Sequence, residues 1–101
     1  MKVFISQPMR GKTDEEIQEE RARVIKECEE LTAREGKNLV VIDSFIKNAP
    51  DNASPLWYLG ESIKWLSDAD TAFFAPGWNE NRGCRVEHAA CSEYGIRIIS
   101  D

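Results

Sequence analysis

Residues 71–90, TAFFAPGWNENRGCRVEHAA, join a short apolar run to a glycine-bearing loop and then to a segment with helical spacing. The apolar run, residues 71–75, predicts a buried strand, and the loop that follows it spans residues 76–83. A helix is predicted from about Arg82 to Tyr94, with Gly95 just after its end. Its expected apolar face consists of Val86, Ala89, Ala90 and Tyr94. Such a junction places backbone N–H groups at one end of a sheet, where anions and polar ligands bind well.

Strand and helix patterns alternate along the rest of the chain in the order β-α-β-α-β-α-β. The predicted strands are residues 2–6, 38–43, 71–75 and 96–99. This alternation predicts a single α/β domain over residues 1–101, a three-layer sandwich with a four-stranded, mainly parallel sheet. Strand order 2-1-3-4 is the simplest arrangement, because strand–helix–strand crossovers are right-handed.

Helix boundaries are marked by local capping signals. Thr13 and Glu16 form a capping-box pattern before the first helix, and Gly36 ends that helix. Ser54 and Pro55 begin the second helix. The apolar stripe of the first helix is Ile17, Val24, Ile25, Cys28 and Leu31, and that of the second is Leu56, Leu59, Ile63 and Leu66.

The predicted strand order brings two loops into one crevice. The switch point of the sheet falls between the first and third strands. The loops that leave those strands are Gln7–Lys12 and Pro76–Gly83, which contain the most distinctive residues of the chain. A third loop, from Ser44 to Ala53 with Phe45 in it, is long enough to suggest a lid or binding loop. We therefore expect a ligand site at this crevice.

Composition limits the classes of function. The chain has 101 residues, is 42% hydrophobic and carries a formal net charge of -5, which disfavours a general grip on DNA or RNA. There is no apolar run of transmembrane length and no signal-peptide pattern, so no membrane association and a cytoplasmic location are expected. Cys28 and Cys91 are interpreted as buried thiols, whereas Cys84 lies at a helix start, where a reactive thiol is an alternative.

Glu87 is the first candidate for chemistry. A carboxylate near a helix N-terminus is stabilised in its charged form and can attack an anomeric carbon to form a glycosyl intermediate. An ordinary role in the helix dipole or at the surface is the alternative. His88 is adjacent, but neighbouring helical residues point about 100° apart, so we interpret it as structural or exposed.

Arg10 and Arg82 are candidate anion contacts, because the guanidinium group can bind phosphate through two hydrogen bonds. Simple surface charge is the alternative for each, and Arg85, inside the helix, is a weaker candidate. No residues have metal-ligand spacing, and the chain has neither a Gly-x-Gly-x-x-Gly sequence nor a Walker loop. We therefore expect no metal and no cofactor.

Three sequence elements resemble the nucleoside 2-deoxyribosyltransferase-like superfamily, and the resemblance covers almost the whole chain. The elements are Ser6-Gln-Pro-Met-Arg-Gly11, the lead into the third strand from Trp65 to Asp70, and Gly83-Cys-Arg-Val-Glu87-His-Ala-Ala. The similarity is closest to the DUF4406 branch. The Gly-x-x-x-Glu element after the third strand is its most specific part.

This resemblance implies a flavodoxin-like fold and a nucleoside or nucleotide site. In active members, a glutamate at the position of Glu87 attacks C1′ of a 2′-deoxyribosyl group and releases the base to water or to a second base. The implied substrate-binding residues are Ser6, Gln7, Pro8, Arg10, Gly11, Trp78, Asn79, Arg82 and Gly83. Many members are oligomers, so a homo-oligomer is expected.

Two positions depart from the family pattern. Phe4 stands where active members usually carry a tyrosine, and about Ser62 they carry an aspartate that assists the leaving base. Glu61, Asp68, Asp70 and Glu80 are the carboxylates that could replace this aspartate. These departures bear on catalysis more than on fold or ligand binding.

Three functional hypotheses follow. The first is an enzyme of N-glycosidic bond chemistry, either a 2-deoxyribosyltransferase or a deoxynucleotide N-glycosidase. The second is a non-catalytic nucleotide-binding module. The third is a small oligomeric interaction protein, suggested by Trp57, Tyr58 and Trp65, whose alternative role is core packing.

Overall fold

The computed structural model describes residues 1–44, 46 and 48–100. Four parallel strands form one sheet in the order β2-β1-β3-β4, with register pairs such as Val3 with Thr71 and Phe73 with Ile99. The elements are β1 (Lys2–Ser6), α1 (Asp14–Glu35), β2 (Val40–Val41), α2 (Pro55–Leu66), β3 (Thr71–Phe74), η1 (Trp78–Glu80), α3 (Arg82–Tyr94) and β4 (Arg97–Ser100). The predicted α/β class and strand order are confirmed, and the arrangement is flavodoxin-like.

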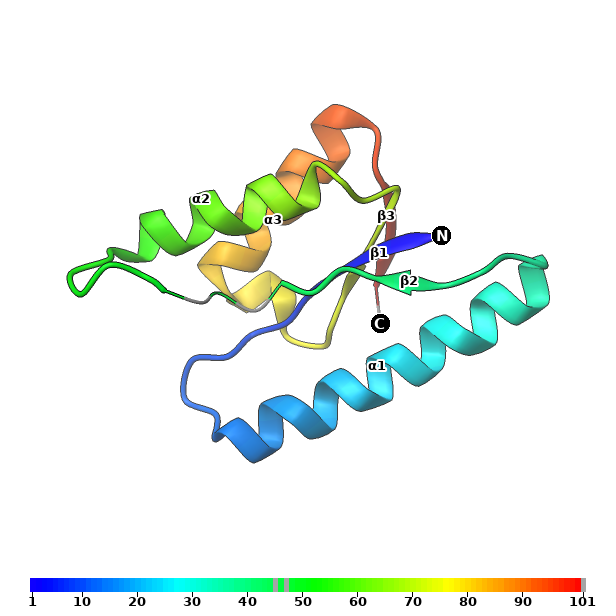
Figure 1. The fold of residues 1–101 in the computed structure, drawn as a ribbon, viewed down its shortest axis with the longest axis horizontal. Helices are drawn as coiled ribbons and strands as arrows, with labels where there is room; N and C mark the ends of the chain where they lie inside the picture. The colour runs from blue at the N-terminus through cyan, green and yellow to red at the C-terminus, as the bar shows by residue number, and fades with distance from the viewer. Residues whose placement is uncertain (45, 47, 101) are drawn as a thin grey trace.

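Helices cover both faces of the sheet, with α1 on one face and α2 and α3 on the other (Figure 1). Alternate residues of β1 supply both layers of the core, because successive strand side chains point to opposite faces. Val3 and Ile5 pack with residues of α1, whereas Phe4 packs with Leu66 of α2 and Cys91 of α3. The central strands β1 and β3 are buried throughout except at Lys2, as expected for a parallel sheet between helices.

The predicted helix caps are confirmed. The Thr13 side chain accepts a hydrogen bond from the Glu16 N–H, and the Glu16 carboxylate accepts one from the Thr13 N–H, which completes the capping box. Ser54 caps α2 through the Trp57 N–H, and Pro55 stands in its first turn. Gly36 ends α1 with φ 66°, a conformation that favours glycine. These signals are local, which is why the sequence alone defines them.

The predicted second strand is shorter and more exposed than expected. Residues 38–43 were expected to form a buried strand, but β2 comprises only Val40 and Val41, and Val40 is 51% exposed. The reason is position in the sheet: β2 is an edge strand that pairs with β1 alone. An apolar run cannot distinguish an edge strand from a central one.

The expected apolar faces of α2 and α3 are wrong in part. Leu56 is 75% exposed at the first turn of α2, although Leu66 at the other end of that helix is buried. In α3, Val86 and Tyr94 are exposed, and the buried residues are Cys84, Glu87 and Cys91. The orientation of α3 therefore turns a carboxylate toward the sheet, which hydrophobic spacing could not indicate.

The two ends of the sheet differ in what they hold. At the end where strands begin, the Asp70 carboxylate accepts hydrogen bonds from the Lys2 N–H at 3.0 Å and the Thr71 hydroxyl at 2.8 Å. Asp70 thus fastens the start of β3 to β1, and the loops that follow β1 and β3 lie at the other end of the sheet.

The predicted loop from Ser44 to Ala53 includes residues 45 and 47, which lie outside the described residues. No helix in the described part of the chain is long and apolar enough to cross a membrane.

Candidate functional site

A cleft of about 550 Å³ lies between the loops that follow β1 and β3. The first loop contributes Pro8, Arg10 and Lys12. The second loop and the start of α3 contribute Pro76, Gly77, Glu80, Asn81, Arg82, Gly83 and Arg85. We call this the basic cleft. Its position confirms the prediction that loops 7–12 and 76–83 share one crevice.

Gly77 turns the second loop at the point where it meets the first. Its φ of 85° is in the left-handed region, and a Cβ at this position would lie 3.8 Å from Cγ of Pro8. Pro8 is thereby placed against the opposite loop, as a wall of the basic cleft. Gly11, with φ 79°, turns the chain between Arg10 and Lys12, and the Lys12 N–H donates to the Met9 carbonyl at 3.1 Å.

The basic cleft is strongly positive for a protein of net charge -5. Four cationic side chains line it against one carboxylate, that of Glu80. Arg85 donates to the Asn79 carbonyl at 3.2 Å, which holds its guanidinium group beside the loop. The guanidinium groups of Arg10 and Arg82 make no hydrogen bond or ion pair with any described residue, so both can contact an anion.

The first turn of α3 adds backbone donors to these charges. Asn81 is the N-cap, and its side chain accepts a hydrogen bond from the Cys84 N–H at 3.0 Å. The N–H groups of Arg82 and Gly83 belong to the same first turn and have no acceptor within the helix. Both residues line the basic cleft. The helix dipole and the arginines therefore favour the same sign of ligand charge.

Glu87 lies in the second turn of α3 rather than in the first, and only 7% of its surface is exposed. Its Oε1 accepts a hydrogen bond from the Ser6 hydroxyl at 2.8 Å, which links α3 to the end of β1. Burial raises the pKa of Glu87 from 4.5 to about 7, and the Ser6 hydrogen bond opposes that rise. The carboxyl group is thus poised between its neutral and ionised forms near neutral pH.

Glu87 is not among the residues that line the basic cleft within the described chain. It lies one helical turn beyond Gly83, on the same face of α3, because residues four apart stack along a helix. Gly83 does line the cleft and carries no side chain that could cover the residue below it. Helical spacing therefore puts Glu87 one turn behind a residue that forms the wall of the cleft.

Gln7 was expected to bind substrate, but its side chain bonds to α1 instead. It is buried, and its Nε2 donates to the Ile17 carbonyl at 3.1 Å and to Glu20 Oε1 at 3.2 Å. Its Oε1 is buried without a hydrogen-bond partner among the described residues. Gln7 thus fastens the loop after β1 to α1, and it does not line the basic cleft.

Trp78 and Asn79, expected to shape the pocket, do not line the basic cleft either. The Trp78 ring stacks on His88 with centroids 4.1 Å apart and contacts Phe74 at 5.5 Å. His88 also meets Phe74 edge-on at 4.9 Å, so its expected structural role is supported. Asn79 contributes its backbone carbonyl to Arg85.

The three cysteines are all buried. Burial raises the pKa of Cys28 and Cys91 to about 11 each. The pKa of Cys84 is also raised, mainly by burial, although its position at a helix start alone would lower it. The geometry therefore does not favour the reactive-thiol alternative for Cys84.

Three charged residues of the cleft were missed or given little weight in the sequence. Lys12 precedes the cap of α1, and the sequence pattern marks it only as the end of a loop. Arg85 stands one turn beyond Arg82, and this i,i+3 spacing was the available signal. Among the carboxylates considered as replacements for the family aspartate, only Glu80 lines the cleft. Asp70 is bonded at the opposite end of the sheet, and Glu61 pairs with Lys64 on α2.

Among the described residues, no group of three or more His, Cys, Asp or Glu side chains is arranged to hold a metal ion. A search of curated proteins found no significant match, and neither did a search of solved structures. The family described as "Domain of unknown function (DUF4406)" matches residues 1–100. The chain therefore belongs to the DUF4406 family.

Proposed function

We propose that this protein carries out N-glycosidic bond chemistry on a nucleoside or nucleotide, as a 2-deoxyribosyltransferase or a deoxynucleotide N-glycosidase. The observation that carries the proposal is the buried carboxyl group of Glu87, bonded to Ser6 behind a positively charged cleft. The resemblance of the Gly83–Glu87 element to the nucleoside 2-deoxyribosyltransferase-like superfamily supports the same chemistry.

In this proposal the ionised Glu87 carboxylate attacks C1′ of the 2′-deoxyribosyl group. A C1′–O bond forms while the C1′–N bond breaks, and the electron pair of the broken bond goes to the base, which takes up a proton. Glu80 is the carboxyl group of the cleft lining that can supply this proton. Water or a second base then attacks C1′, gives up a proton and releases the carboxylate.

Binding and chemistry would be carried out by different groups of the site. Arg10, Arg82 and the N–H groups at the start of α3 would hold a phosphate group, and Gly83 would allow the sugar to approach α3. The Ser6 hydrogen bond fixes one oxygen of Glu87 and leaves the other for the sugar. The expected partner is thus a small molecule, with no DNA, RNA or membrane involved.

A chromatographic assay tests the proposal. The protein is incubated at pH 8, above the pKa of Glu87, with 2′-deoxynucleosides and their 5′-monophosphates, with and without a second free base. Release or exchange of base should occur with the native protein and vanish in Glu87→Gln, which keeps the size of the side chain. Turnover that survives this substitution would refute the role of Glu87.

A non-catalytic nucleotide-binding module is the second candidate, and a specific observation favours it. Only 7% of the surface of Glu87 is exposed, and this residue does not line the basic cleft. In addition, Phe4 stands where active members of the resembled superfamily usually carry a tyrosine. This candidate predicts that 5′-monophosphates raise the melting temperature of the native protein and of Glu87→Gln equally, with no base release. A smaller shift in the variant would speak for the enzyme.

We also propose a homo-oligomer, as the family resemblance implies. Leu56, in the first turn of α2, is an apolar side chain that is 75% exposed and that a neighbouring copy could cover. Sedimentation velocity of the native protein and of Leu56→Asp checks this, because an oligomer that uses this surface should dissociate in the variant.

A further inference from the structure

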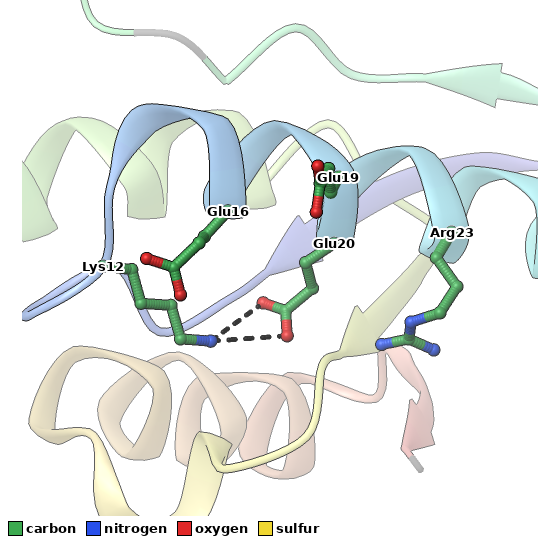
Figure 2. A pocket seen from close by; sticks show the side chains of 5 residues that line it. All are labelled: Lys12, Glu16, Glu19, Glu20 and Arg23. Carbon is green, nitrogen blue, oxygen red and sulfur yellow. Dashed lines mark hydrogen bonds and ion pairs between the residues drawn. The ribbon is translucent and has the colours of Figure 1, made fainter.

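Lys12 lies between two clefts. It lines the basic cleft, and it also lines a groove of about 370 Å³ on α1 together with Glu16, Glu19, Glu20 and Arg23 (Figure 2). We call this second site the acidic groove. Lys12 is the residue that the two linings share. A change of charge in the acidic groove can therefore alter the position of Lys12 and with it anion binding in the basic cleft.

The Lys12 side chain is paired on the acidic side. Figure 2 shows its ammonium group directed at the Glu20 carboxylate, and Nζ lies 3.4 Å from both Oε1 and Oε2. The Glu20 carboxylate is held by a second contact, because its Oε1 also accepts a hydrogen bond from Gln7 Nε2 at 3.2 Å. A distance of 3.4 Å is long for a charge-assisted hydrogen bond. Lys12 can therefore leave Glu20 for an anion that it can approach more closely.

The same pairing reduces the positive charge that Lys12 contributes to the basic cleft. Arg10 and Arg82 have no partner among the described residues, whereas Lys12 faces a carboxylate and Arg85 a carbonyl oxygen. A phosphate group in the cleft would therefore compete with Glu20 for Lys12. The Lys12 side chain keeps 30% of its surface exposed and has a flexible four-carbon stem, which permits the exchange.

We propose that Lys12 is a phosphate-binding residue of the basic cleft and that Glu20 sets the affinity by competing for it. The proposal rests on the proposed function and deepens it, since it adds Lys12 to the phosphate contacts and names the residue that competes for it. It also goes beyond that function, because it concerns anion binding and does not depend on the chemistry at Glu87. Lys12 is a binding residue here, and Glu20 is a positioning residue that acts through it.

Inorganic pyrophosphate is a suitable probe, because it presents phosphate groups without a base or sugar. Its Kd is measured by titration calorimetry at low salt for the native protein, Lys12→Gln, Glu20→Gln and the double variant. We expect Lys12→Gln to weaken binding by about two- to fivefold and Glu20→Gln to strengthen it by a similar factor, which is the size of effect that a single ion pair near the surface has. In the double variant, Glu20→Gln should have little further effect, because its partner is already gone.

Glu30→Gln is the matched control, since it removes one negative charge from the exposed part of the same helix without touching a cleft. A gain in affinity from Glu20→Gln that Glu30→Gln reproduces would reduce the effect to net charge and overturn the proposal. Unchanged or weaker binding in Glu20→Gln would overturn it too, as would the absence of pyrophosphate binding by the native protein. If base release fails but this pattern holds, the proposed function falls and the inference stands.

Discussion

Glu87 links the protonation of one side chain to the stability of the whole fold. Burial raises its pKa from 4.5 to about 7, so the folded protein keeps a proton that the unfolded chain loses at lower pH. The stabilisation is therefore fully present below pH 4.5 and is lost as the pH rises through about 7. At high pH the folded state must hold a buried carboxylate, with one hydrogen bond from Ser6.

The first prediction compares the native protein with Glu87→Gln. Between pH 4.5 and about 7 the Glu87 titration should remove about 3 kcal/mol from the free energy of unfolding of the native protein. The variant lacks this titration, so its stability relative to the native protein should rise with pH. Urea unfolding of both proteins at pH 5 and pH 8 measures the difference, and parallel pH profiles would contradict the assignment.

The second prediction concerns Ser6→Ala. The Ser6 hydroxyl lowers the pKa of Glu87 against the larger effect of burial, so its removal should raise that pKa above about 7. Loss of this buried hydrogen bond should also cost about 1–3 kcal/mol of stability. A carboxyl ¹³C titration followed by NMR reads the pKa directly. Ser92→Ala, at an exposed position of α3, is the control and should leave the titration unchanged.

At the scale of the element, the start of α3 sets how closely a ligand can approach. Gly83 is the second residue of the helix, and a Cβ there would meet only the Asn81 side-chain oxygen, at 3.5 Å. The position therefore tolerates alanine structurally. Because Gly83 lines the basic cleft, the absence of a side chain there leaves room for a ligand beside α3.

The third prediction is that Gly83→Ala separates stability from binding. Alanine should raise the free energy of unfolding by up to about 1 kcal/mol, because glycine is a poor helix former. The added methyl group should weaken pyrophosphate binding several-fold by narrowing the cleft. Gly60→Ala, in α2 and with nothing within 4 Å of the added Cβ, should stabilise the protein to a similar extent and leave binding intact. Equal binding by the two variants would argue against close approach at Gly83.

Elements with local signals were predictable, and those defined by tertiary contacts were not. The caps at Thr13 and Ser54 and the end of α1 at Gly36 follow from hydrogen bonds within a few residues. The exposure of Leu56 and the short strand β2 depend on what the rest of the chain covers, which helical or strand spacing does not contain.

The candidate site divides in the same way. Strand order predicted that two loops would meet, because parallel strands end at the same edge of the sheet. It did not predict that Trp78 would stack on His88 or that Glu87 would lie behind the cleft wall. These outcomes depend on the rotation of α3 about its axis, because the buried face of that helix, Cys84, Glu87 and Cys91, includes a carboxylate.

At the scale of the whole molecule, the protein is negatively charged overall but positively charged around the basic cleft. The formal net charge is -5, yet four cations gather around the basic cleft. Long-range attraction to a polyanion needs a broad positive surface, whereas a small anion needs only the cleft.

The fourth prediction follows from this contrast. Pyrophosphate affinity should fall as salt is raised from about 0.02 to 0.2 M, because the cleft charges are partly exposed and screened. Duplex DNA of about 20 base pairs should show no binding by fluorescence anisotropy across the same range, because the net negative charge repels it. Tight, salt-sensitive DNA binding would show that the basic cleft is part of a larger nucleic-acid surface.

The central place of β1 has a kinetic consequence. Val3 pairs with Val41 of β2 on one side and with Thr71 of β3 on the other. Pairing with β2 alone, the second strand to be synthesised, therefore leaves one edge of β1 without a neighbour. During synthesis β1 keeps one edge open until β3 has emerged, and contacts over such sequence separations slow folding. We therefore expect nascent β1 to be a binding site for chaperones until residues 71–74 have emerged and paired with it.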